Sequence, residues 1–161
     1  MDIPVEYGVP PTRLTRVRVS NMVERVREAE NAIVAQMESQ GYGEDDVFAI
    51  KLAMEEALVN AIRHGNSNDA TKFVTLQYYV GADRIIVSIA DEGPGFRPED
   101  VPDPTLDENL EKPHGRGLML MRAYMTDVRF NERGNEIWMM RLIEPAGGPS
   151  AGERDASVAG E

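Results

Sequence analysis

Two successive stretches of helical periodicity constrain the fold of this chain more than any other feature of its sequence. Apolar residues recur at every third or fourth position over residues 22–40 and again over residues 45–64, and Gly41 and Gly43 separate the two stretches. Each stretch predicts a helix with one apolar face. Because such a face must be buried against another element, the two helices require a second layer that covers them.

Polar residues suited to helix N-termini stand before both stretches. Ser20 or Asn21 is expected to cap the first helix by accepting a hydrogen bond from a backbone N–H of its first turn. Residues 44–46 are all acidic, and we expect them to provide both a cap and a negatively charged first turn for the second helix.

Five further segments have the composition and alternation of β-strands. They cover residues 14–19, 72–80, 84–90, 128–131 and 136–143. Short turns at residues 81–83 and 133–135 join four of them into two predicted hairpins, and residues 115–125 predict a third helix. This order of elements predicts an α+β domain, a two-layer sandwich with the helices on one face of an antiparallel-rich sheet.

The chain is expected to divide into a leader, one domain and a tail. Residues 1–12 contain three prolines and show no periodicity, so we expect a loose leader. Within a domain over residues 13–144, the acidic and proline-rich residues 97–114 predict a lid, since loops of this length are uncommon in compact domains unless they have a function. Residues 145–161 are rich in Gly, Ala and Ser and predict a disordered tail.

Composition excludes several classes of function. A formal net charge of −11 argues against binding to nucleic acid or to anionic lipid, because both depend on clustered Lys and Arg. The absence of cysteine excludes disulfides and thiolate metal sites. No apolar run approaches the roughly 20 residues of a membrane helix, and no signal pattern is present. We therefore expect a cytoplasmic protein with no membrane or nucleic-acid partner.

The second predicted helix carries residues suited to phosphoryl chemistry. Glu56, Asn60 and His64 follow one another at intervals of four residues, so they lie on one side of the helix. Asn disfavours the middle of a helix because its amide competes for backbone hydrogen bonds, and a ligand or buried partner must compensate. The Asn60 oxygen can ligate Mg²⁺, and Glu56 can orient or deprotonate a hydroxyl. Taken alone, a solvated Glu56 and an Asn60 at a kink explain the same pattern.

Two glycine-containing stretches follow along the chain. Asp91 ends an apolar strand and precedes Gly93 and Gly95, which allow a flat ligand to approach the backbone. The Asp91 carboxylate can accept a hydrogen bond from an exocyclic amine such as that of adenine. Gly115 and Gly117 stand where the predicted lid becomes a helix, and free N–H groups at a helix N-terminus bind phosphate. Each stretch on its own is explained equally well as an ordinary turn or helix entry.

In this order, the three stretches resemble the GHKL ATPase superfamily, which includes gyrase, Hsp90, histidine kinases and MutL. The resemblance covers roughly residues 14–144 and implies the Bergerat fold, with a mixed, mostly antiparallel sheet and ATP bound between the helices and the lid. Residues 56–66 and 118–127 are most similar to the anti-sigma factor serine kinases of the RsbW type.

The resemblance implies a role for each matching residue in the first two stretches. Glu56 would be the general base of a phosphoryl transfer. Asn60 would bind the nucleotide through a Mg²⁺ ion. Asp91 would bind adenine, in a pocket that Gly93 and Gly95 shape.

The resemblance also implies roles for the residues of the third stretch and the identity of the protein partners. Gly115, Arg116, Gly117 and Leu118 would lie at the ATP phosphates beneath the lid. The family phosphorylates a serine on an anti-anti-sigma antagonist of the STAS fold, sequesters a sigma factor and usually forms homodimers. The implied function is therefore that of a serine-protein kinase and anti-sigma factor.

Two other functions fit part of the same sequence. A non-catalytic module of a bacterial partner-switching pathway would use ATP to order the lid and to expose or hide a surface. The catalytic half of a histidine kinase would need a helical domain that bears an acceptor histidine. The residues before the second predicted helix contain no histidine, which disfavours this last function.

Overall fold

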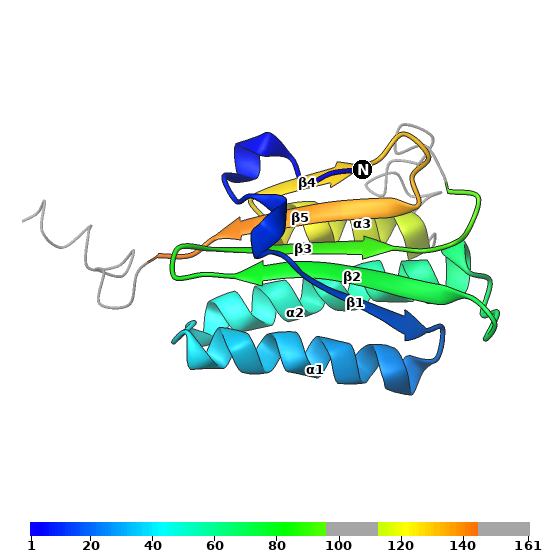
Figure 1. Ribbon diagram of the computed structural model, residues 1–161, viewed down its shortest axis with the longest axis horizontal. Coiled ribbons are helices and arrows are strands. Elements are labelled where there is room, and N and C mark those ends of the chain that lie inside the picture. The colour runs from blue at the N-terminus through cyan, green and yellow to red at the C-terminus, as the bar shows by residue number, and fades with distance from the viewer. Residues whose placement is uncertain (96–112, 145–161) are drawn as a thin grey trace, which may run out of the picture.

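Three helices cover one face of a five-stranded sheet (Figure 1). The computed structural model describes residues 1–95 and 113–144. The helices are α1 (Val23–Ser39), α2 (Glu44–Val59) and α3 (Pro113–Tyr124). The strands are β1 (Thr15–Ser20), β2 (Phe73–Val80), β3 (Arg84–Ala90), β4 (Asp127–Phe130) and β5 (Glu136–Leu142).

The sheet confirms the predicted α+β class. Its strand order is β1-β2-β3-β5-β4, and each neighbouring pair is antiparallel. The described strands therefore include no parallel pair, and the sheet is wholly antiparallel over this part of the chain rather than mixed. Both predicted hairpins, β2–β3 and β4–β5, are present.

The main core lies between the helices and the inner face of the sheet. One continuous cluster joins the apolar faces of all three helices to alternate residues of the strands. Its members include Ile33, Met54, Leu76, Val87 and Met121. Strand β3 is buried on both faces, because residues from the N-terminus cover its outer side as the helices cover its inner side.

Neither residue predicted to cap α1 does so. Met22 occupies the N-cap position, and no side chain there makes a capping hydrogen bond. Asn21 is buried instead, and its amide donates to the carbonyl oxygens of Ile62 and Asp69 at 3.4 and 3.1 Å. Tertiary hydrogen bonds thus replace the local cap that the residue type favours.

The second helix begins and ends differently from its prediction. Gly43 is the N-cap and offers no side-chain bond, although Glu44–Asp46 do form the expected acidic first turn. The α geometry stops at Val59, and a π-helical turn, Asn60–Gly65, continues the helix. The predicted helix over residues 45–64 therefore consists of an α-helix followed by a π-helical turn.

Residues 1–12 pack against the sheet and do not form a loose leader. They cross the outer face of the sheet, opposite the helices (Figure 1). A second buried cluster consists of Ile3, Tyr7, Ile86, Trp138 and Met140. The Tyr7 hydroxyl donates to the backbone oxygen of Trp138 at 3.2 Å. The apolar side chains between the prolines bury part of a sheet face that would otherwise be exposed to water.

Most of the predicted lid and the whole predicted tail lie outside the described residues. The last two lid residues, 113 and 114, already belong to α3, which starts two positions before its predicted start. Among the described helices, none is both long and apolar enough to cross a membrane.

Candidate functional site

A cavity of about 250 Å³ opens at the C-terminal end of α2. Its walls come from the π turn, from the end of β3 and the loop after it, from α3, and from the β4–β5 hairpin. Three of the residues predicted for the site, Asn60, Asp91 and Gly95, line this cavity together. The fold therefore brings the first two predicted stretches to one place.

The π turn supplies a large share of the cavity wall. Asn60, Ala61, His64 and Gly65 all line the cavity and all belong to the turn. A π turn is wider than an α turn, is rare, and occurs most often at functional sites. The α geometry ends where Asn60 begins the turn, which explains how an asparagine is accommodated in a long helix.

Gly65, Asp91 and Gly93 fit together without space for side chains on the glycines. A Cβ on Gly65 would overlap the carboxyl group of Asp91, and a Cβ on Gly93 would overlap the backbone carbonyl of Gly65. The end of the π turn thus lies directly against the loop after β3. These contacts, rather than a positive φ, explain why glycine occupies both positions.

The Asp91 carboxyl is half-buried at the cavity wall. Burial raises the pKa of Asp91, and this effect outweighs the opposite effects of a hydrogen bond from the Gly93 N–H and of the charge of Lys72. The Gly93 N–H donates to Oδ1 at 2.8 Å. A carboxylate with one backbone donor keeps further capacity to accept a hydrogen bond from a ligand.

A buried asparagine pair holds this junction in place. The amide of Asn66 donates to Oδ1 of Asn21 at 3.1 Å and to the carbonyl oxygen of Phe73 at 2.9 Å. Its own Oδ1 accepts the backbone N–H of Glu92 at 2.8 Å. The start of α1, the end of the π turn and the loop after β3 are therefore tied together. The sequence analysis did not predict this role for Asn66.

The β4–β5 hairpin closes the opposite wall. The backbone oxygen of Asn135 accepts the N–H of Asp91 at 2.9 Å, and Asn131 Nδ2 donates to Asn135 Oδ1 at 2.7 Å. Gly95 has a φ of +80°, and a Cβ there would overlap the carbonyl of Arg133. Only glycine fits this position, because both the backbone angle and the contact exclude a side chain.

Glu56 and Asn60 face α3 at Gly117. A Cβ on Gly117 would lie 3.1 Å from Glu56 Oε2 and 3.3 Å from Asn60 Nδ2. The glycine therefore lets both polar side chains sit close to the backbone of α3. Glu56 is half-buried and does not line the cavity itself, but it lies one helical turn from Asn60, which does.

The other predicted phosphate residues take different positions. Gly115 is the third residue of α3, so its N–H belongs to the first turn, where backbone donors have no helical acceptor. Arg116 is exposed, whereas Leu118 is buried in the main core. Core packing explains why a leucine stands at position 118, and its side chain does not line the cavity.

Several lining residues were not predicted. Met121, Phe130 and Glu136 reach the cavity from α3, β4 and β5. Apolar residues on strands and helices usually signal core packing, so no local pattern distinguishes these from their neighbours. In the described part of the chain, no group of three or more His, Asp or Glu side chains is arranged to hold a metal ion.

This two-layer fold, with its cavity at the end of α2, is the arrangement that the sequence predicts for an ATP-binding domain. The chain belongs to the histidine kinase-like ATPase domain family, whose sequence profile matches residues 19–141.

Individual proteins that resemble this chain have more specific names than the family does. The chain is 35% identical over 97 residues to the serine-protein kinase RsbW of Bacillus licheniformis, an alignment that covers 55% of this chain and 59% of that protein. It is 33% identical over 112 residues to the serine-protein kinase RsbW of Bacillus subtilis strain 168, covering 64% and 69%. The chain thus matches less than two thirds of the length of the first of these relatives.

A solved structure agrees with the fold. The RsbU and RsbW domains of a Mycobacterium tuberculosis protein superpose with a TM-score of 0.56 at 16% sequence identity. The superposition covers 88% of this chain and 35% of that one. At this identity the match supports the fold alone.

Proposed function

We propose that the chain is an ATP-dependent serine-protein kinase and anti-sigma factor. Two of the proteins it resembles are named serine-protein kinases, and three of the residues predicted for the site line one cavity. The observation that carries the proposal is the position of Asn60, which lines the cavity together with Asp91 and also lies beside Glu56 at Gly117. Asn60 thus links Asp91, the residue proposed to bind adenine, to Glu56, the residue proposed to take a proton.

Asp91 would bind the adenine of ATP. Its half-buried carboxylate stands at the cavity wall and can accept a hydrogen bond from the exocyclic amine. Gly65, Gly93 and Gly95 would let the π turn, the loop after β3 and the β4–β5 hairpin pack closely around the carboxylate, and so hold it in place at the cavity wall.

Asn60 would hold Mg²⁺ through its side-chain oxygen. A single neutral oxygen ligand suits Mg²⁺, which retains several waters and takes its remaining ligands from phosphates. This agrees with the lack of a three-ligand cluster among the described residues. The ion would neutralise charge on the transferred phosphoryl group. The first turn of α3, with Gly115 and Arg116, would donate to the phosphates.

Glu56 would act as the general base. The serine Oγ of the substrate forms a bond to the γ-phosphorus while the bond from that phosphorus to the β–γ bridging oxygen breaks, and ADP leaves. Glu56 takes the proton that the serine hydroxyl loses. Its place beside Gly117 would hold the carboxylate at the phosphate end of the site.

The proposed protein partners are a STAS-type anti-anti-sigma protein as substrate and a sigma factor as the sequestered target. A homodimer of the kinase domain over residues 13–144 is the proposed working form. These partners come from the resemblance to the RsbW kinases.

Phosphoryl transfer to a purified STAS-type candidate partner tests the proposal. With Mg-ATP, mass spectrometry should detect one phosphate on a serine of that protein. If ATP changes the affinity between the two proteins but no phosphate appears, the chain is instead a non-catalytic ATP-gated binding module.

A further inference from the structure

The side of α2 that faces solvent carries apolar residues where an amphipathic helix usually carries polar ones. Phe48 and Val59 are 61% and 40% exposed, and Leu52 between them is half-buried. At about 100° of rotation per residue, these three side chains lie within roughly 40° of one another around the helix axis. They therefore form one apolar strip, about 16 Å long, on the outside of the helical layer.

Helix α3 borders this strip on one side. Phe48 and Tyr124 make an edge-to-face ring contact, with their centroids 6.0 Å apart. Near the other end of the helix pair, a Cβ on Gly117 would lie 3.1 Å from Glu56 Oε2. The start of α2 thus meets the end of α3, so the two helices run antiparallel. Leu120 lies three residues after Gly117 and four before Tyr124, so it is on the same side of α3, and it is half-buried.

The strip on α2 and the adjoining side of α3 make up one surface along the seam between the two helices. We call it the α2–α3 surface, and it consists of Phe48, Leu52, Val59, Leu120 and Tyr124. Single apolar side chains are normal on a protein surface, whereas a group of them on one seam marks a site of contact with another molecule.

Glu56 lies in the same seam. It follows Leu52 by one helical turn, faces Gly117 and is half-buried. Phe48 precedes Glu56 by eight residues, which is about 12 Å along the helix axis. A segment that lies along the α2–α3 surface therefore passes the carboxylate that the proposed reaction uses. This continuity favours the protein that receives the phosphate as the occupant of the surface.

The end of the surface at Phe48 is acidic. Glu44 and Asp45 are exposed in the first turn of α2, whereas Asp46 is half-buried and pairs with Arg141 at 3.0 Å. Exposed carboxylates at an interface favour basic residues on the partner. The part of the partner that lies over Phe48 should therefore be apolar, with basic residues beside it.

We propose that the α2–α3 surface is the docking face for the protein that receives the phosphate. This docking face rests on the proposed kinase function and adds to it the place where the substrate protein binds. The partner lays an amphipathic helix along the seam, with its apolar side against α2 and α3. Its apolar anchor lies over Phe48, and its serine lies at Glu56 about 12 Å away, which is about eight residues along a helix.

Phe48→Ser tests the docking face, because Phe48 does not line the ATP cavity. Phosphate transfer is measured at increasing concentrations of the STAS-type candidate partner, and ATP affinity is measured on the same samples. The variant should raise KM for the partner at least about tenfold, as an exposed aromatic anchor is lost. Both kcat at saturating partner and ATP affinity should stay as in wild type.

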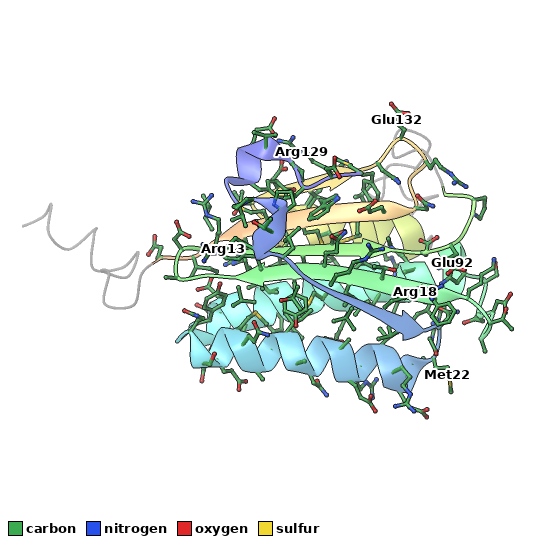
Figure 2. All side chains as sticks on the ribbon, in the orientation of Figure 1. Arg13, Arg18, Met22, Glu92, Arg129 and Glu132 are labelled. Atoms are coloured by element: carbon green, nitrogen blue, oxygen red, sulfur yellow. The ribbon has the colours of Figure 1, made fainter. Side chains whose placement is uncertain are left out.

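Two further variants test the chemistry of the contact. Phe48→Leu keeps an apolar side chain and should raise KM less than about threefold. Glu44→Lys reverses a charge at the end that faces basic residues of the partner, so it should raise KM as well. Val5→Ser is the matched control and should leave KM unchanged. Val5 is 90% exposed on the N-terminal segment, which crosses the outer face of the sheet, where Figure 2 shows Arg13.

Direct binding separates failure of the docking face from failure of the kinase proposal. Calorimetric titration with Mg²⁺ and a non-hydrolysable ATP analogue measures partner affinity without any transfer, and thermal unfolding shows that each variant is folded. If the partner binds, Phe48→Ser weakens that binding at least about tenfold and wild type transfers no phosphate, the docking face stands and the kinase proposal fails.

Other results overturn the docking face. It is wrong if Phe48→Ser binds the partner as tightly as wild type does, or if Val5→Ser weakens binding equally. It is also wrong if Phe48→Ser instead dissociates a homodimer or weakens only the binding of a sigma factor. A wild-type protein that binds no STAS-type candidate partner would overturn both proposals.

Discussion

Gly65 lies so close to Asp91 that a single added methyl group on the glycine would overlap the aspartate carboxyl group. The end of a helix that carries Glu56 and Asn60 is thereby fixed against the loop that carries Asp91. In sequence these residues belong to separate stretches, and the contact joins them into one site.

Gly65→Ala tests this contact. The new methyl group must displace the Asp91 side chain, so ATP affinity should fall roughly 10–100-fold as a charged hydrogen bond is lost. Stability should fall by about 1–3 kcal/mol because of overpacking. Calorimetric titration and thermal unfolding measure the two effects. Gly43→Ala is the matched control for ATP affinity, since a Cβ on Gly43 would meet nothing within 4 Å and the residue lies at the other end of α2.

Asp91→Asn separates binding from stability. The amide keeps the shape of the carboxylate but removes its negative charge. Burial raises the pKa of this carboxyl group, which means that burial disfavours the charged form. We expect the free energy of unfolding of the nucleotide-free protein to be unchanged or higher, while ATP affinity falls about 10–100-fold. Denaturant unfolding and nucleotide titration check both effects. Unchanged ATP affinity would mean that Asp91 does not bind the base.

Tyr7→Ala tests whether the N-terminal residues are part of the fold. Tyr7 is 1% exposed, so truncation should cost about 3–5 kcal/mol of unfolding free energy. Val5 is 90% exposed on the same segment, and Val5→Ala should change stability by less than about 0.5 kcal/mol. If both variants lower the free energy of unfolding in urea by the same small amount, the N-terminal segment is loose, as the sequence suggests.

Glu30→Gln tests a buried acid between α1 and α2. Burial and the nearby Glu55 raise the pKa of Glu30 from 4.5 to about 7. The folded state therefore binds a proton that the unfolded state has released, and stability falls as the pH rises from about 4.5 to about 7. The variant should gain about 1–3 kcal/mol over wild type near pH 8 and almost nothing near pH 4. Denaturant melts at both pH values measure this effect, and the exposed Glu28→Gln on the same helix is the control for the loss of a surface carboxylate.

The periodic parts of the fold were predictable from the sequence. Helical and alternating patterns identify the three helices and both hairpins, because each buries one face against a shared core. The same alternation indicates which residues of each strand face the core, but no register or strand order was predicted from it. The loop containing Asp91 was also identified, since a polar residue and two glycines interrupt an apolar strand.

Features that depend on distant contacts were not predictable. The π turn at Asn60 is an alternative hydrogen-bond pattern in a helix, and residue type alone does not distinguish it from an α turn. Asn21 was expected to cap a helix because its residue type favours that position. Its hydrogen bonds to Asn66 and Ile62 join residues far apart in sequence, so no local pattern reveals them. The packing of Tyr7 was missed because prolines around it obscure any period.

The proposed kinase activity depends most directly on Glu56 as the base of a phosphoryl transfer. Glu56→Gln keeps the size of the side chain beside Gly117 but cannot take a proton at the pH of the reaction. The measurement is transfer of labelled γ-phosphate to a serine of the STAS-type partner, with ATP affinity measured on the same samples. We predict wild-type ATP affinity with transfer reduced about 100-fold or more in the variant. Transfer at the wild-type rate in Glu56→Gln, or ATP binding by the wild type without transfer to any serine, would contradict the account.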